Sequence, residues 1–141
     1  MTGRVLFFVI LTVMFWGATP VLEKIGLRNA DPLIGVTIRS LAVTIALIGY
    51  VIIAGRVKDL IHVEGRTLAI FSITGIMAGL LGMVTYFFAL KNAPASEVVP
   101  IAATYPLVSA VLSFLILGEQ FTLIRFAGTI FIVLGVWLVQ I

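Results

Sequence analysis

Five long apolar segments constrain the fold of this sequence more than any other feature. Each is about as long as the 20 or so residues that a helix needs to cross the hydrocarbon core of a bilayer. Most of the charged residues fall between the segments, and no segment alternates with the period of two that a strand requires. We therefore predict an all-α integral membrane protein with one domain over residues 1–141. Its predicted transmembrane helices cover residues 5–22, 33–54, 67–90, 98–117 and 123–141.

The composition agrees with a membrane protein. Of the 141 residues, 62% are hydrophobic and 11% are charged, against about 45–50% apolar and about 25% charged in soluble domains. A small soluble domain cannot bury such a surplus, because much of its surface stays in water. The chain has no cysteine and one histidine, so we predict no metal site and no cofactor. Its nine Lys and Arg residues are scattered, which favours contact with the lipid bilayer and no nucleic-acid partner.

The first apolar segment is interpreted as a span. It is longer than the apolar region of a secretory signal, which has about 7–15 residues, and it lacks a small-residue cleavage site before Glu23. Counting Lys and Arg on alternate sides then predicts a multi-pass protein of the cell membrane, with a cytoplasmic N-terminus and an external C-terminus. The margin is small and leaves dual insertion open. One side carries Arg4, Arg56, Lys58, Arg66 and Arg125, and the other carries Lys24, Arg28 and Lys91, with Arg39 near it.

Small residues mark the faces along which helices in lipid approach each other. The third segment carries Gly75, Gly79 and Gly82, and the fifth carries Gly128 and Gly135. We predict that these five glycines pack helices together. For the last two, a contact within the chain and a contact with another subunit both stay open.

Two prolines lie inside predicted helices. Pro20 displaces the carbonyl group of Trp16, and Pro106 displaces that of Ala102, because proline has no N–H group and its ring crowds the preceding turn. Transporters use such broken helices at their binding sites. For Pro106 a solute site and a fixed kink are both open, whereas a kink is favoured for Pro20. Pro100 is expected in the first helical turn, where proline is tolerated.

Polar side chains within the spans supply candidates for a solute cavity. Arg39 could contact an anionic solute group, but pairing with Glu23 or Glu97, or reaching the interface, is favoured. The remaining candidates either line a cavity or bond neighbouring helices. They are Trp16, Thr19, Tyr86, Thr104, Tyr105 and Ser109. No nucleophile–base set or phosphate-binding loop accompanies them, so we do not expect an enzyme.

Several short motifs, in this order and spacing, resemble the EamA-like domain of the drug/metabolite transporter (DMT) superfamily. They are Trp16-Gly17, Arg39 after 34–38, the run 89–95, Pro106, Leu117-Gly118-Glu119, Gly128, and Leu134-Gly135-Val136. The resemblance implies a five-helix unit that normally occurs twice, so that this chain is one half of a DMT-type inverted-repeat transporter. It also implies that four helices surround the path, with Trp16, Tyr86, Thr104 and Tyr105 along it.

The resemblance also bears on function and partners. It implies export or exchange of metabolites, amino acids or drugs. A single unit implies a second chain, either a copy of this chain in a homodimer, inverted or not, or a related five-helix partner. We therefore predict a subunit of a small-solute secondary transporter that works by alternating access as a dimer. The alternatives are a non-transporting membrane scaffold or assembly subunit, and a component of a lipid-linked sugar flippase. Small multidrug exporters resemble the chain less, because they have four helices and an acidic residue in the first, where 5–22 has none.

Overall fold

The computed structural model describes residues 3–118, 120 and 122–139, with the side chain of residue 125 left out. Throughout these residues the regular structure is helical and no strand occurs, so the all-α prediction is confirmed. The chain divides into two compact units, Met1–Asn92 and Ala93–Ile141. Each unit is described by itself. Glu119 of the family motif and the last two residues of the fifth predicted span lie outside the described residues.

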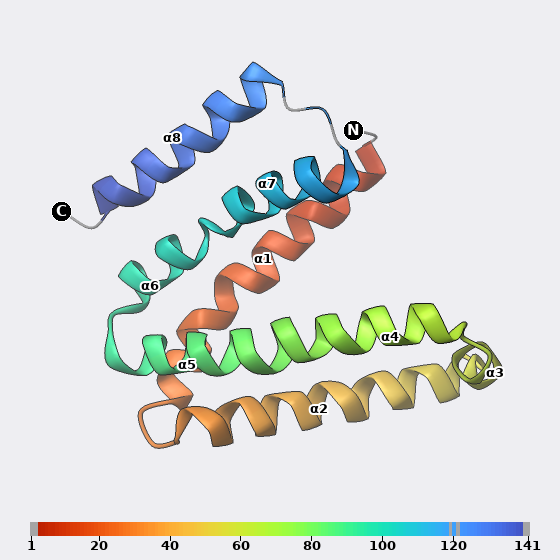
Figure 1. Ribbon diagram of the computed structural model, residues 1–141. Coiled ribbons are helices and arrows are strands. Elements are labelled where there is room, and N and C mark those ends of the chain that lie inside the picture. Colours follow the sequence, from red (N-terminus) through yellow and green to blue (C-terminus); the bar gives the residue numbers. More distant parts are fainter. Residues whose placement is uncertain (1–2, 119, 121, 140–141) are drawn as a thin grey trace. The chain divides into compact units, whose positions relative to one another are not determined.

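The first unit contains a long pair of neighbouring helical segments. Helix α2 lies beside a continuous helical run formed by α4, η1 and α5, and α5 also contacts α1 (Figure 1). A short helix, α3, joins the two sides of the pair. The elements are α1 (Gly3–Gly26), α2 (Pro32–Ile53), α3 (Val57–Ile61), α4 (Gly65–Thr74), the π-helix η1 (Gly75–Gly82) and α5 (Met83–Asn92).

The second unit contains α6 (Ala95–Ala102), α7 (Tyr105–Leu117) and α8 (Leu123–Val139), and α6 contacts α8. Helix α7 ends at Gly118, which has a left-handed backbone with φ of 65°. Glycine adopts this conformation without the clash that a Cβ atom would cause, and it commonly ends helices.

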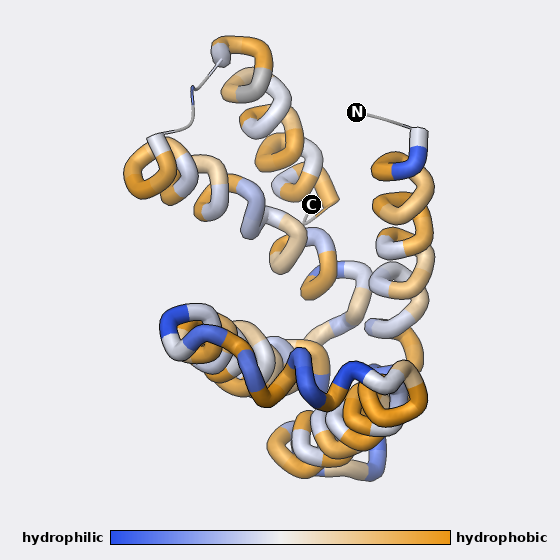
Figure 2. Tube along the Cα trace, turned by 90° about the vertical axis from the view of Figure 1, so that its right-hand side faces the viewer, coloured by the Kyte–Doolittle hydropathy of each residue, from blue (hydrophilic) through white to orange (hydrophobic). Residues whose placement is uncertain are grey.

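Four helical segments in the described residues are long and apolar enough to cross a membrane. They are Gly3–Gly26, Pro32–Ile53, Gly65–Asn92 and Ala95–Leu117, and the shorter apolar segment Phe126–Val139 follows them. The first helix extends beyond the apolar segment 5–22, because Glu23 and Lys24 find partners within the first unit. Figure 2 shows hydrophobic residues along most of every helix, as expected for helices that lipid surrounds.

The core of the first unit lies between α2 and α5. Phe87 and Val36 are each 2% exposed, and Leu27 and Leu90 are buried with them. Gly35 permits this close packing, because a Cβ atom there would lie 3.2 Å from a ring carbon of Phe87. The packing glycine of α2 was not among the predicted ones.

The fourth span is broken next to Pro106. Helix α6 ends at Ala102 and α7 begins at Tyr105, so that Pro106 lies in the first turn of α7. In the break, the hydroxyl group of Thr104 donates a hydrogen bond of 2.7 Å to the carbonyl oxygen of Ile101. A proline in the first turn has no intrahelical donor to lose. The helix therefore restarts at Tyr105, directly before Pro106, after an interruption at Ala103 and Thr104.

Pro20 and Pro100 lie within continuous helices. Pro20 is buried in α1, which continues through it. Pro100 lies inside α6, because that helix begins at Ala95 after Pro94 and not at the predicted residue 98. The prediction that Pro100 occupies the first turn is therefore wrong. The helix start was misplaced because a prediction from apolar residues leaves out the polar residues with which α6 begins.

The predicted packing glycines meet few neighbours in the chain. A Cβ atom at Gly75, Gly79, Gly128 or Gly135 would meet no described atom within 4 Å. At Gly82 it would lie 3.3 Å from the carbonyl oxygen of Met77 in the same π-helix. Their role in helix packing stays a prediction.

Candidate functional site

Polar side chains from three helices gather where α1 ends and α2 begins. We call them the Glu23 cluster; they are Glu23 and Lys24 of α1, Arg39 of α2, and Tyr86 and Lys91 of α5. The positions of the first four fall within predicted spans or at their ends. In lipid, ionisable groups at such positions carry a cost and are default candidates for function.

The start of α2 fixes the position of Arg39. A side-chain oxygen of Asp31 accepts a hydrogen bond of 2.9 Å from the backbone N–H of Leu33, and Pro32 occupies the first helical position. Both features are typical helix starts. Arg39 follows Pro32 by about two helical turns, which brings its side chain to the end of α1.

Arg39 pairs with Glu23. The Nε atom of Arg39 lies 3.4 Å from Oε1 of Glu23, and the two side chains are 43% and 10% exposed respectively. Oε1 is buried and accepts no hydrogen bond from the residues that the structure describes. An ionised carboxylate can accept several hydrogen bonds, so Glu23 keeps unused acceptor capacity beside a cation. Glu23 was one of the partners predicted for Arg39, and the structure shows this pair.

The two lysines of the cluster bind backbone carbonyl groups. Nζ of Lys24 donates to the carbonyl oxygens of Leu90 at 2.6 Å and Lys91 at 3.2 Å. Nζ of Lys91 donates to the carbonyl oxygen of Ala30 at 2.7 Å. Carbonyl groups in the last turn of a helix lack intrahelical donors and carry the negative end of its dipole. The lysines therefore join the end of α5 to α1 and to the turn that follows it.

The remaining predicted candidates are placed as follows in the first unit. Tyr86 is half-buried on α5 and lies within electrostatic reach of Glu23. Trp16 is 67% exposed on α1. The hydroxyl group of Thr19 donates to the carbonyl oxygen of Phe15 at 2.7 Å, so its hydrogen is used within α1. The structure thus gathers Arg39 and Tyr86 around Glu23, an acid that was not among the predicted cavity residues.

In the second unit, the candidates lie at and after the break in the fourth span. Thr104 is in the break itself, Tyr105 begins α7 with 58% of its surface exposed, and Ser109 is exposed one turn later. Tyr105 and Ser109 share a face of α7 because they are four residues apart.

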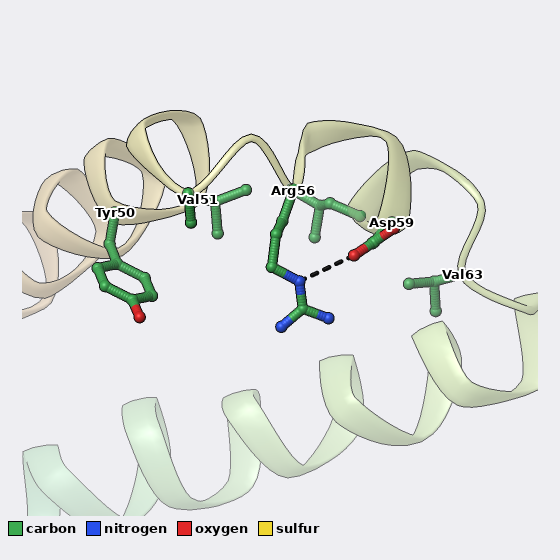
Figure 3. Close-up of a pocket in the computed structure, with 7 residues that line it drawn as sticks. Tyr50, Val51, Arg56, Asp59 and Val63 are labelled. Atoms are coloured by element: carbon green, nitrogen blue, oxygen red, sulfur yellow. Dashed lines mark hydrogen bonds and ion pairs between the residues drawn. The ribbon is translucent and has the colours of Figure 1, made fainter.

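An open pocket with a volume of about 290 Å³ lies at the other end of α2, and sequence reasoning missed it (Figure 3). Its polar residues are Tyr50, Arg56 and Asp59. Nε of Arg56 donates a hydrogen bond of 2.8 Å to Oδ2 of Asp59. The only sequence signal was the spacing of opposite charges three residues apart, which permits a pair on one helical turn.

Comparison with known proteins identifies the family. The model of the EamA-like transporter family matches residues 3–141. The chain belongs to the EamA-like transporter family. The resemblance inferred from the sequence motifs is thereby confirmed, and with it the membrane-transporter class of the protein.

Relatives of this EamA-like chain include proteins of nearly the same length. An "Uncharacterized transporter in cobO 3'region" from Sinorhizobium sp is 26% identical over 135 residues, which are 96% of this chain and 95% of that protein. An uncharacterized protein of Methanocaldococcus jannaschii is 26% identical over 132 residues, 94% of this chain and 93% of the relative.

A third relative shares a shorter region with the EamA-like chain. It is named "Probable 4-amino-4-deoxy-L-arabinose-phosphoundecaprenol flippase subunit ArnF" and comes from Photorhabdus laumondii. It is 38% identical over 75 residues, which are 49% of this chain and 60% of that protein. No solved structure matches the chain.

Proposed function

We propose that this chain is a subunit of a small-solute secondary transporter that works by alternating access as a dimer of five-helix units. The observation that carries the proposal is the Glu23 cluster. In this cluster a buried carboxylate oxygen of Glu23 lies next to Arg39, and no group of the described residues donates a hydrogen bond to that oxygen. Such a group can accept a proton or a donor group of a solute, and its arginine partner can receive an anionic group.

The lengths of the relatives support assembly from single units. Two curated relatives are matched over 95% and 93% of their length, so chains of this size recur among the relatives. In DMT-type transporters two such units form the pathway, and here a second copy of the chain, inverted or not, or a related five-helix partner would supply the other unit.

The cavity residues have distinct roles in this proposal. Trp16 and Tyr105 supply aromatic walls, which favour a mostly apolar or cationic solute. Tyr86 and Ser109 add hydrogen-bonding groups. The fourth span is interrupted before Pro106, and transporters place such interrupted helices at their solute sites.

A comparison of aromatic variants tests the proposal. Cells that produce the wild-type chain are compared with cells that carry an empty vector, and the metabolites gained or lost are measured by mass spectrometry in the cells and the medium. We expect Trp16→Ala and Tyr105→Ala to abolish the difference. Trp137→Ala is the matched control, because Trp137 is similarly exposed at 62% near the end of α8 and should leave transport unchanged.

The same experiment has clear contrary results. Unchanged transport in both cavity variants would exclude the proposed path. Loss of transport in all three variants would also exclude it, since the effect would then follow from removing any exposed aromatic residue. Chemical cross-linking of each variant in the membrane checks that the dimer still forms.

One comparison favours a second function, in which the chain is a subunit of a lipid-linked sugar flippase. The relative with 38% identity over 75 residues carries that printed name. The test is translocation of a fluorescent polyprenyl-phosphate sugar in proteoliposomes. Movement of this lipid together with unchanged levels of water-soluble metabolites in the cell assay would replace the first function by the second.

A further inference from the structure

The pocket at the end of α2 has both an apolar and a charged part. Val51, Ala54, Leu60 and Val63 supply the apolar lining. Arg56 and Asp59 lie between Tyr50 and Val63 (Figure 3). A ligand that fills this pocket must therefore combine an apolar portion with a polar group.

The Arg56–Asp59 pair leaves binding atoms available. Its hydrogen bond joins Nε of Arg56 to Oδ2 of Asp59 at 2.8 Å. The two terminal nitrogens of the guanidinium extend from Nε toward the neighbouring helical run of the third span (Figure 3), and Oδ1 is the second oxygen of the carboxylate. The hydrogen bond and the charge of Asp59 raise the pKa of Arg56, so the cation persists at every physiological pH. A guanidinium fork of this kind matches the oxygens of a phosphate group.

The position of the pocket selects a lipid over a dissolved molecule. The second span ends at Ile53 and the third begins at Gly65, so the pocket residues from Tyr50 to Val63 straddle a boundary of the membrane. At this depth phospholipid head groups meet the ends of their acyl chains. The lining contains one cation and one anion and so has no net charge, which distinguishes it from a basic site for anionic lipids.

We propose that this pocket binds a phospholipid with a phosphoethanolamine head group. The phosphate group contacts the terminal nitrogens of Arg56, and the ammonium group donates to Oδ1 of Asp59. An acyl chain lies against Val51, Leu60 and their apolar neighbours. The proposal does not depend on transport, because the pocket shares no residue with the Glu23 cluster.

Lipid retention measured by native mass spectrometry tests the proposal. The purified full chain in detergent receives equal amounts of dioleoyl phosphatidylethanolamine, phosphatidylcholine and phosphatidylglycerol. We expect the first lipid to be retained at least about fivefold above each of the others. Choline cannot donate a hydrogen bond to Asp59, and phosphatidylglycerol places no cation there.

Variants of the charged pair sharpen the test. Arg56→Gln should lower retention of phosphatidylethanolamine about tenfold, which equals about 1.4 kcal/mol. Asp59→Asn should remove its advantage over phosphatidylcholine. Lys58→Gln is the control, because Lys58 lies in the same helix but does not line the pocket. Circular dichroism checks the fold of each variant. If Arg56→Gln unfolds, Arg56→Lys is used in its place. Lysine keeps the positive charge, but it cannot hold Asp59 and at the same time present a two-nitrogen fork to a phosphate group.

Several results would overturn the proposal. One is equal retention of the three lipids by the wild-type chain. A second is stronger retention of phosphatidylglycerol, which would indicate a simple anion site. A third is wild-type retention in Arg56→Gln, and a fourth is an equal loss in Lys58→Gln, which would indicate attraction by any nearby positive charge.

Discussion

Gly35 is the position at which the packing of the first unit can be tested most directly. A Cβ atom there would lie 3.2 and 3.3 Å from two ring carbons of Phe87 and 3.5 Å from Leu27. Phe87 is 2% exposed and Leu27 is 3% exposed, so neither side chain can withdraw into open space. Overpacking of a core costs about 1–3 kcal/mol, whereas replacing glycine by alanine in a helix gains up to about 1 kcal/mol.

Gly49→Ala provides a matched control in the same helix. No described atom lies within 4 Å of a Cβ atom at Gly49, so this variant gains the helical propensity without the clash. The expected difference in the free energy of unfolding between Gly49→Ala and Gly35→Ala is therefore about 1–3 kcal/mol, with Gly35→Ala the less stable. Because both changes are Gly→Ala in α2, the propensity gain cancels in the comparison.

The assay is reversible unfolding in mixed micelles with increasing dodecyl sulfate, followed by circular dichroism. Equal stability of the two alanine variants would refute the close approach of α2 and α5. A double variant adds Phe87→Leu to Gly35→Ala. In the presence of Phe87→Leu, Gly35→Ala should lower the free energy of unfolding by less than it does in the wild-type chain. The reason is that residues in contact do not contribute independently to stability.

Three further outcomes are expected. Lys24→Met should lower the free energy of unfolding by about 2 kcal/mol, because it removes charged hydrogen bonds to the end of α5. The control Arg28→Met, in the exposed turn, should change the free energy of unfolding by less than about 0.5 kcal/mol. Pro106→Ala restores a backbone donor and should slow amide exchange in the break; unchanged exchange would show that proline does not cause the break. Since the chain has no native cysteine, single cysteines can report its topology. We expect Asn29→Cys to be labelled from outside the cell and His62→Cys from inside. Comparable labelling of each variant from both sides would establish dual insertion.

The spans could be predicted because hydropathy alone determines them. Most residues from Leu33 to Ile53 are apolar, and α2 ends within one residue of the predicted limit. Helix starts are less predictable. Helix α6 begins at Ala95 although the apolar pattern begins at Val98, because its first turn is polar and depends on the conformation of Pro94. The π-helical part of the third span was also not predicted, since α- and π-helices use the same apolar residues.

The site could be predicted only in part. Arg39 was recognised as unusual because a charge inside a span is costly, but the choice of Glu23 as its partner depends on how the ends of α1 and α2 meet. The pocket beside Arg56 was missed because the path of the segment from Gly55 to Val63 is not encoded in hydropathy. The lysines of the Glu23 cluster were counted only as charges, although their ammonium groups bind carbonyl oxygens.

The eight π-helical residues Gly75–Gly82 have a mechanical consequence. In a π-helix each backbone N–H group donates to the carbonyl oxygen five residues earlier, whereas in an α-helix it donates to the one four residues earlier. A change from π- to α-helix would therefore replace each hydrogen bond by another and would leave no backbone group unbonded in hydrocarbon. The exchange would lengthen the third span slightly and turn Gly65–Thr74 about its axis. Met83–Asn92 would stay in place, because Phe87 and Lys91 anchor it to the neighbouring helix and turn. Such an exchange would rotate one half of a membrane helix while the other half stays docked.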